Sequence, residues 1–202
     1  VNLTSGAITF NILQLAPTIT AARTYTFGST AHTINGNFDI NPSSTGANAL
    51  TVNMGATLTV AATATTTITG SGAGPATATL DTTSSNRFLA TGRLDIQTNG
   101  TLTANSSTIT ISNATAGGIG FIRTGTFTAN TSTVKYTGAA SFVLTSGTFT
   151  GSSAFYNLQL ALGGAVGTSV KVYTFGSGAI TVNNTLDLNP SDGDTGTAYM
   201  QV

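Results

Sequence analysis

The chain has 202 residues, of which only 6% are charged, and its six basic and six acidic side chains give a net charge of zero. Without a basic run it offers no electrostatic footprint for nucleic acid or an anionic membrane surface. It has no cysteine, which excludes disulfides, thiolate catalysis and cysteine metal sites, and its short apolar runs exclude a transmembrane helix.

Short segments in which apolar and polar residues alternate recur along the whole chain. This alternation is typical of strands with one buried and one solvent-facing side, and the abundant threonine and β-branched residues favour strands. Gly, Asn and Ser between the segments are suited to turns. In chain order the clearest segments are Phe38-Asp39-Ile40, Leu58-Thr59-Val60, Leu94-Asp95-Ile96, Ile109-Thr110-Ile111 and Leu186-Asp187-Leu188.

The beginning of the chain recurs near its end. Residues 10–16 match residues 155–161 at an offset of 145, and the motif YTFGS at 25–29 returns at 173–177 at an offset of 148. Residues 35–43 match 183–191 at the same offset of 148, and after a two-residue insertion residues 50–52 match 200–202. We therefore predict one unit over residues 1–202, in which residues 10–52 recur as 155–202 with a period of about 148 residues.

A shorter repeat lies within this period. Leu102, Phe127 and Phe149 each follow a Gly-Thr pair, at steps of 25 and 22 residues. This spacing corresponds to one coil of a β-solenoid and is too short for a separate domain. Because equivalent residues of successive coils stack ~4.8 Å apart, the three residues are predicted to form an inward ladder, with Thr101 and Thr103 in outward ladders.

The repeated YTFGS motif is interpreted as structural. Its aromatic residues flank a threonine, as expected of a strand that packs on a core. We therefore expect the following residues in the interior: Tyr25, Phe27, Tyr173 and Phe175.

The succession FYNLQL, YTFGSGAITVNNTLDL, GTLTANSSTITI and GTFTANTSTVKYTG resembles the long tandem-repeat β-helix proteins that many bacteria place on or outside their surface. The resemblance implies an all-β, right-handed parallel β-helix with coils of about 20–25 residues, and an extracellular or cell-surface location. It implies no catalytic residue. The alternative fold is an antiparallel β-sandwich with strand donation from residues 1–15.

Candidate catalytic groups are sparse. His32 is the only histidine and is interpreted as a surface or partly buried residue rather than a catalytic base. Asp39 and Asp187 occupy the same repeat position, and Asp95 lies in the same Leu-Asp-Ile setting, so all three are predicted to be outward-facing strand residues. A paired-carboxylate glycosidase is therefore disfavoured, and the chain is predicted not to be an enzyme.

One acidic cluster could bind a cation. Asp192 and Asp194 flank a glycine at the two-residue insertion. Calcium prefers several oxygen ligands from a flexible loop, although Asp and Gly are also ordinary turn residues. These two residues are a weak calcium candidate, and no other cofactor is expected.

The repeat phase favours a structural role. A solitary solenoid must cover its end coils, and neither terminus has a charged, Pro-rich or helical cap. We expect a subunit or segment of an extracellular filament, stalk or surface layer that assembles head to tail with further copies of itself. An adhesin-type module that contacts polysaccharide or a cell surface is the alternative. Frequent Thr-x-Thr pairs also raise ice binding, but alternating strands produce such pairs anyway.

Overall fold

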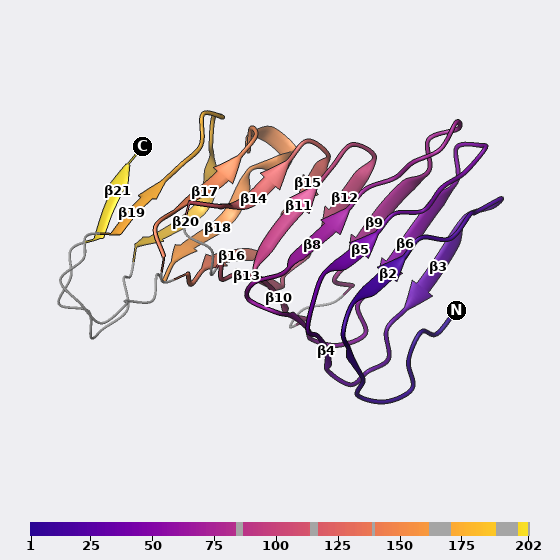
Figure 1. Cartoon of the computed structure of the whole chain (residues 1–202). Coiled ribbons are helices and arrows are strands. Elements are labelled where there is room, and N and C mark those ends of the chain that lie inside the picture. The colour runs from indigo at the N-terminus through magenta and orange to yellow at the C-terminus, as the bar shows by residue number, and fades with distance from the viewer. Residues whose placement is uncertain (84–86, 114–116, 139, 162–170, 189–197, 202) are drawn as a thin grey trace.

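The computed structural model of the chain describes residues 1–83, 87–113, 117–138, 140–161, 171–188 and 198–201. The pairings between its strands are parallel, and the strands form three sheets, named here walls 1, 2 and 3. Figure 1 shows the strands stacked in chain order from the indigo N-terminal end to the yellow C-terminal end. The predicted parallel β-solenoid is therefore confirmed, and the antiparallel β-sandwich is wrong.

The chain runs from wall 1 to wall 2 to wall 3 and then starts the next coil. Wall 1 contains β1 (Thr9–Phe10), β4 (His32–Ile34), β7 (Leu58–Val60), β10 (Leu89–Thr91), β13 (Thr108–Ile111), β16 (Thr133–Tyr136), β18 (Phe155–Leu160) and β20 (Val182–Leu188). Wall 2 contains β2 (Leu13–Leu15), β5 (Phe38–Ile40), β8 (Thr65–Ile68), β11 (Arg93–Ile96), β14 (Ile119–Arg123), β17 (Phe142–Ser146), β19 (Lys171–Thr174) and β21 (Ala198–Gln201).

Wall 3 is shorter. It contains β3 (Arg23–Thr26), β6 (Ala49–Asn53), β9 (Thr77–Asp81), β12 (Gly100–Thr103) and β15 (Thr126–Thr128). Isolated bridges continue it at both ends, between Asn2 and Thr26 and between Phe149 and Ile180. The 3₁₀ helix η1 (Gly151–Ser153) follows at a corner. In the described part of the chain no helix has the length and apolar character to cross a membrane.

The coils vary in length because their corners vary. Leu89 pairs with Ile109, 20 residues later, whereas Leu58 pairs with Leu89, 31 residues later. The long coil contains residues 70–83, whose repeat signal is weak. It nevertheless places β9 in register between β6 and β12. Strand alternation therefore persists where corner sequences diverge.

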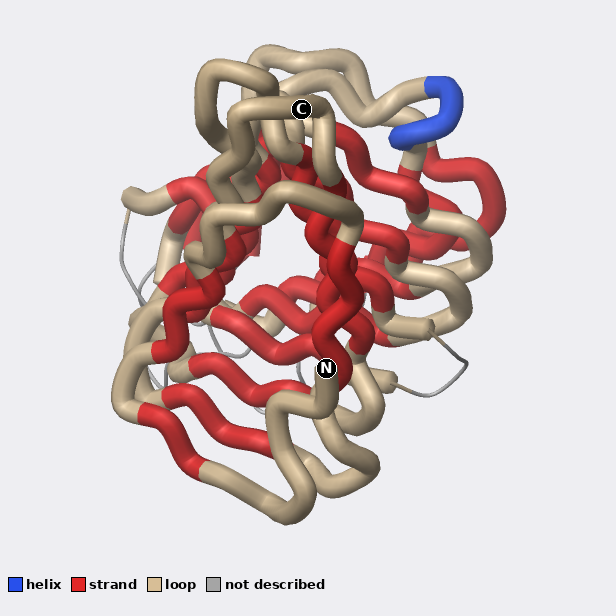
Figure 2. Tube along the Cα trace, turned by 90° about the vertical axis from the view of Figure 1, so that its right-hand side faces the viewer, coloured by secondary structure: helices blue, strands red, loops and turns tan. Residues whose placement is uncertain are grey.

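The interior is a continuous apolar column enclosed by the three walls (Figure 2). Leu102 and Phe127 pair in register, and both are fully buried together with Phe149, so the predicted inward ladder is confirmed. Phe149 stacks on Phe155 with a ring-centroid distance of 4.7 Å. Of the YTFGS aromatics, Phe27 and Tyr173 are buried, and the other two, Tyr25 and Phe175, are partly buried against the core.

The Thr-Ala-Asn segments of the short repeat form the corner that follows wall 3. Asn105 and Asn130 have positive φ angles of 50° and 49°, a conformation that Asn tolerates better than most residues. The Asn105 amide donates to Asp81 Oδ1 at 2.8 Å, and the Asn130 amide donates to Asn105 Oδ1 at 3.3 Å. The short repeat therefore encodes a hydrogen-bonded stack of corners as well as a strand.

Candidate functional site

The aspartates considered for catalysis lie on outer faces and do not converge. Asp39 and Asp95 are on wall 2, in register with Thr67 between them, whereas Asp187 is on wall 1. Gln159 Nε2 donates to Asp187 Oδ2 at 2.9 Å. Each aspartate alternates with inward-facing apolar neighbours, as predicted from the sequence, and no carboxylate pair is formed by these three residues.

The candidate calcium ligands Asp192 and Asp194 lie outside the described residues, so calcium binding there stays a prediction. Among the residues that the structure describes, no three His, Cys, Asp or Glu side chains gather as metal ligands.

His32 belongs to a buried polar cluster near the N-terminal end. Ile8 N–H donates to His32 Nδ1 at 3.3 Å, which leaves the proton on Nε2, 2.9 Å from Thr4 Oγ1. Gly28 N–H also donates to Thr4 Oγ1, at 2.7 Å. Burial lowers the pKa of His32, so the neutral ring is favoured. These partners indicate a structural role, and the ring is more deeply buried than the sequence predicted.

The outer face of wall 3 carries a rank of hydroxyl groups. The following residues are in register across its five strands: Thr24, Thr51, Thr79, Thr101 and Thr126. A second rank, two residues further along each strand, is interrupted by Asn53 and Asp81. Wall 3 therefore presents one unbroken threonine file and one mixed polar file.

The two copies of the long repeat make the same strand pairings. In the first copy β2 pairs with β5, and Leu13 lies beside Phe38. In the second copy β18 pairs with β20, and Leu158 lies beside Leu186, which corresponds to Phe38. Equivalent residues of the two copies therefore have equivalent partners in the neighbouring coil.

The structure extends the repeat beyond the segment found by sequence comparison. The motif LTSG occurs at residues 3–6 and again at 144–147. A Cβ added at Gly28 would lie 2.7 Å from Thr4 O, and one added at Gly176, its counterpart, would lie 2.1 Å from Thr145 O. Both copies therefore need glycine where the YTFGS turn crosses the LTSG segment of the preceding coil.

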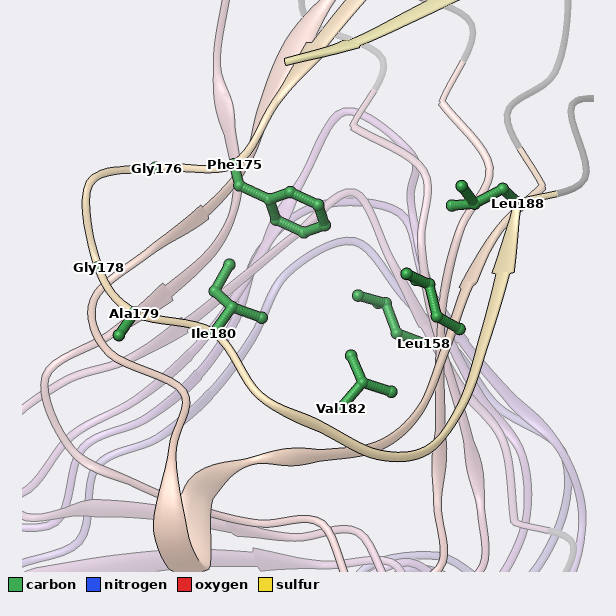
Figure 3. Close-up of a pocket in the computed structure, with 9 residues that line it drawn as sticks. Leu158, Phe175, Gly176, Gly178, Ala179, Ile180, Val182 and Leu188 are labelled. Atoms are coloured by element: carbon green, nitrogen blue, oxygen red, sulfur yellow. The ribbon is translucent and has the colours of Figure 1, made fainter. Parts of the chain in front are cut away.

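An apolar cavity opens at the C-terminal end of the solenoid. It has a volume of about 570 Å³, and the side chains of Phe175, Ile180, Val182 and Leu188 line it together with Leu158 (Figure 3). These residues come from β18, β20 and the turn after β19. The cavity is the part of the apolar core at β20, the last strand of wall 1 in the described residues.

Equivalent apolar residues of the two copies differ in solvent exposure at this end. Leu186 and Leu188 are 50% and 53% exposed, whereas their counterparts Phe38 and Ile40 are fully buried. In the first copy β8 lies against β5, whereas β20 is the last strand of wall 1 in the described residues. The candidate functional site is this apolar end, formed by the half-exposed Leu186 and Leu188 and the partly buried Ile180 and Val182.

Comparison with family models, curated proteins and solved structures finds no match to the chain. The sequence pointed to the junctions between copies but did not name the residues of this end. A signal was present, because Leu186 and Leu188 align with the core residues Phe38 and Ile40.

Proposed function

We propose that the chain is a structural segment of an extracellular filament, stalk or surface layer, of the tandem-repeat β-helix kind found on bacterial surfaces. In this proposal further coils stack on its ends, so that copies join head to tail. The observation that carries the proposal is the contrast between Phe38, fully buried, and Leu186, half exposed at the same repeat position.

Two physical costs of an open end support the proposal. An edge strand such as β20 presents backbone groups that another strand can pair with. Covering the exposed half of Leu186 or Leu188 would contribute ~1 kcal/mol, about half of the value for burying a fully exposed leucine. A stacked coil would satisfy both demands, and the junction would resemble the interior of the solenoid.

The proposal is tested by the association of the chain with itself. We expect sedimentation to reveal larger species as concentration rises, and negative-stain images to contain rods. The double variant Leu186→Asp and Leu188→Asp should shift the population to monomers, because two charges would be desolvated at the junction. The control Thr59→Asp alters an exposed residue in mid-solenoid and should associate like the parent chain. A parent chain that stays monomeric at all concentrations would contradict head-to-tail joining.

A second candidate function is binding of polysaccharide, and the threonine file of wall 3 favours it. Hydroxyl groups repeated on five paired strands offer regularly spaced hydrogen-bonding groups to a repeating sugar chain. Glycan-array binding that is lost in the double variant Thr79→Val and Thr101→Val, but retained in Thr59→Val on wall 1, would support it. Absence of glycan binding by the parent chain would contradict this second function.

A further inference from the structure

The one histidine of the chain occupies an interior position of wall 1. His32 is 2% exposed, and its register partner in the next coil is Leu58, which in turn pairs with Leu89. Both leucines are fully buried. An ionisable ring therefore stands in a ladder whose next members are aliphatic. Because an apolar side chain would suffice at this position, the polar contacts of the ring need an explanation of their own.

These contacts connect the ring to residues 3–8, the corner that precedes β1. Ile8 N–H donates to His32 Nδ1 at 3.3 Å, and His32 Nε2 lies 2.9 Å from Thr4 Oγ1. The same Thr4 hydroxyl accepts the Gly28 N–H at 2.7 Å. Residues 3–8 contain no strand, so the side chain of His32 supplies hydrogen bonds that a sheet would supply elsewhere.

The second copy shows that this cluster is not a requirement of the repeat. Its counterparts of His32 and Thr4 are Ile180 and Thr145. Thr145 Oγ1 is buried without a hydrogen-bond partner among the described residues, whereas Thr4 Oγ1 has two partners. The repeat therefore folds without this histidine, and His32 gives the first copy a contact that depends on protonation.

No other ionisable side chain faces the ring from the segments that pack against it. These segments are residues 3–8, residues 27–31, β1 and β7, and their sequences contain no charged residue. The charged groups of the next elements point elsewhere: Val1 N donates to Thr24 O, Arg23 is exposed, and Asp39 is on the outer face of wall 2. Between pH 7.5 and pH 5 a change of charge at this corner is therefore a change at His32.

We propose that residues 3–8 form a pH-sensitive corner, which opens in acid because protonated His32 no longer accepts the Ile8 N–H. The imidazolium ion has two N–H donors and no acceptor. Protonation therefore places two donors against each other at Nδ1 and puts a charge into an apolar ladder. Opening of the corner gives the ring access to water, and it uncovers the first YTFGS turn, where Thr4 lies against Gly28.

The direction of the pH effect follows from the burial of the ring. Burial lowers the pKa of His32, and a hydrogen bond with the Gly28 backbone opposes this shift only in part. The open corner, whose ring is hydrated, therefore binds a proton more readily than the closed corner below about pH 6.5. The closed corner has its full stability above that pH and loses stability as the pH falls.

The opening is expected to stay local. Two backbone hydrogen bonds flank the corner, from Leu3 N–H to Thr26 O at 2.8 Å and from Thr33 N–H to Ile8 O at 3.1 Å. A short segment with so few backbone bonds opens at a lower free energy than the strands of the walls. The proposal concerns a part of the molecule remote from the apolar end, and it does not depend on the joining of copies.

Hydrogen exchange of the intact chain tests the proposal. Mass spectrometry follows peptides that cover residues 1–8 and residues 142–149, the matching segment of the second copy, and each rate is divided by the intrinsic rate at the same pH. From pH 7.5 to pH 5.0 the protection of residues 1–8 should fall several-fold. The upper limit is ~30-fold, which corresponds to a histidine with a pKa of about 6.5 in the open corner. Residues 142–149 should keep their protection.

Two variants assign the effect to the ring. The amide of His32→Gln is neutral at both pH values and can accept the Ile8 N–H, so residues 1–8 should be equally protected at pH 7.5 and pH 5.0. His32→Ile, with the residue of the second copy, should be less protected at pH 7.5 and lose nothing further in acid. This second variant keeps the test decisive if the glutamine disturbs the packing.

Three results would overturn the proposal. The first is a parent chain whose residues 1–8 are equally protected at both pH values. The second is an acid-induced loss in His32→Gln or His32→Ile as large as that in the parent, because another group would then be responsible. The third is a loss in residues 142–149 equal to that in residues 1–8, because acid would then destabilise the whole solenoid instead of one corner.

Discussion

The two copies of the long repeat pair their strands alike but place them on different walls. Tyr25 lies in β3 on wall 3, whereas its counterpart Tyr173 lies in β19 on wall 2. Likewise Phe38 is on wall 2 and Leu186 is on wall 1. From one copy to the next the chain therefore completes five coils and then passes along two more walls. The recurrence of YTFGS marks equivalent neighbours and not an equivalent face of the solenoid.

A corner that changes position accounts for this difference. In the first copy the chain turns between β4 and β5, at residues 35–37, whereas β20 continues as one strand from Val182 to Leu188, with a register shift opposite Phe155 and Asn157. A Cβ at Gly36 would lie 2.6 Å from Asn11 O, so this corner requires glycine. The second copy has Asn184 there, and its amide donates to Asn157 Oδ1 at 2.8 Å along the extended strand.

The second copy turns earlier instead. The offset between copies grows from 141 at Leu3 and Leu144 to 145 at Phe10 and Phe155, which is an insertion of four residues. The insertion includes η1, whose Gly151 has a φ of +58°. Strand pairing is therefore set by the repeat, and the wall on which a strand lies is set by where glycine-rich corners fall.

The largest expected contrast between the copies is in the cost of removing a core side chain. Phe38→Ala should destabilise the chain by ~3–5 kcal/mol, because a fully buried aromatic leaves a cavity. Leu186→Ala should cost only ~1 kcal/mol, since half of that side chain is already exposed. Urea unfolding of both variants measures the difference, and equal costs would contradict an uncovered end.

Exchanging the corner residues tests the origin of the wall shift. Gly36→Asn should cost ~1–3 kcal/mol, because its Cβ overlaps the Asn11 carbonyl of the neighbouring coil. The reciprocal Asn184→Gly should cost ~1 kcal/mol, through loss of an exposed amide hydrogen bond and greater backbone entropy. Thermal unfolding compares the two. A Gly36→Asn variant as stable as its parent would show that the corner does not depend on this glycine.

The buried cluster of the first copy should give a pH dependence that the second copy lacks. Because burial lowers the pKa of His32, the unfolded chain binds a proton more readily than the folded chain below about pH 6.5. Stability should then fall as pH drops through that value. His32→Ile introduces the residue of the second copy. The free energy of unfolding of this variant should be ~1–2 kcal/mol lower near pH 7.5, because Ile8 N–H loses its acceptor. Its free energy of unfolding should also change less between pH 7.5 and pH 5.5. An unchanged slope would contradict the assignment.

The smallest effect concerns the polar pair on the outer face. Gln159→Ala should lower the free energy of unfolding by less than ~1 kcal/mol, because it removes a partly buried hydrogen bond to Asp187. Gln14→Ala, at the equivalent and exposed position of the first copy, should change the unfolding midpoint little. A larger loss in Gln14→Ala would reverse the ranking.

Much of the fold could be predicted from local pattern. The Gly-Thr pairs before Leu102, Phe127 and Phe149 predicted a ladder whose members are all fully buried. The alternation around Asp39 predicted its outward orientation. The burial of His32 was not predicted, because its partner Thr4 lies 28 residues away in another coil. The residues of the apolar end were not named, because their exposure depends on which strand lies beside them.

By itself the sequence determined the strands, their inward and outward faces, and the repeat, because each of these follows from alternation and spacing along one chain. The tertiary structure decided which wall each strand occupies and which apolar residues stay uncovered. Both depend on contacts between coils, such as the approach of Gly36 to the Asn11 carbonyl and the cover of β5 by β8, and no single segment contains that information.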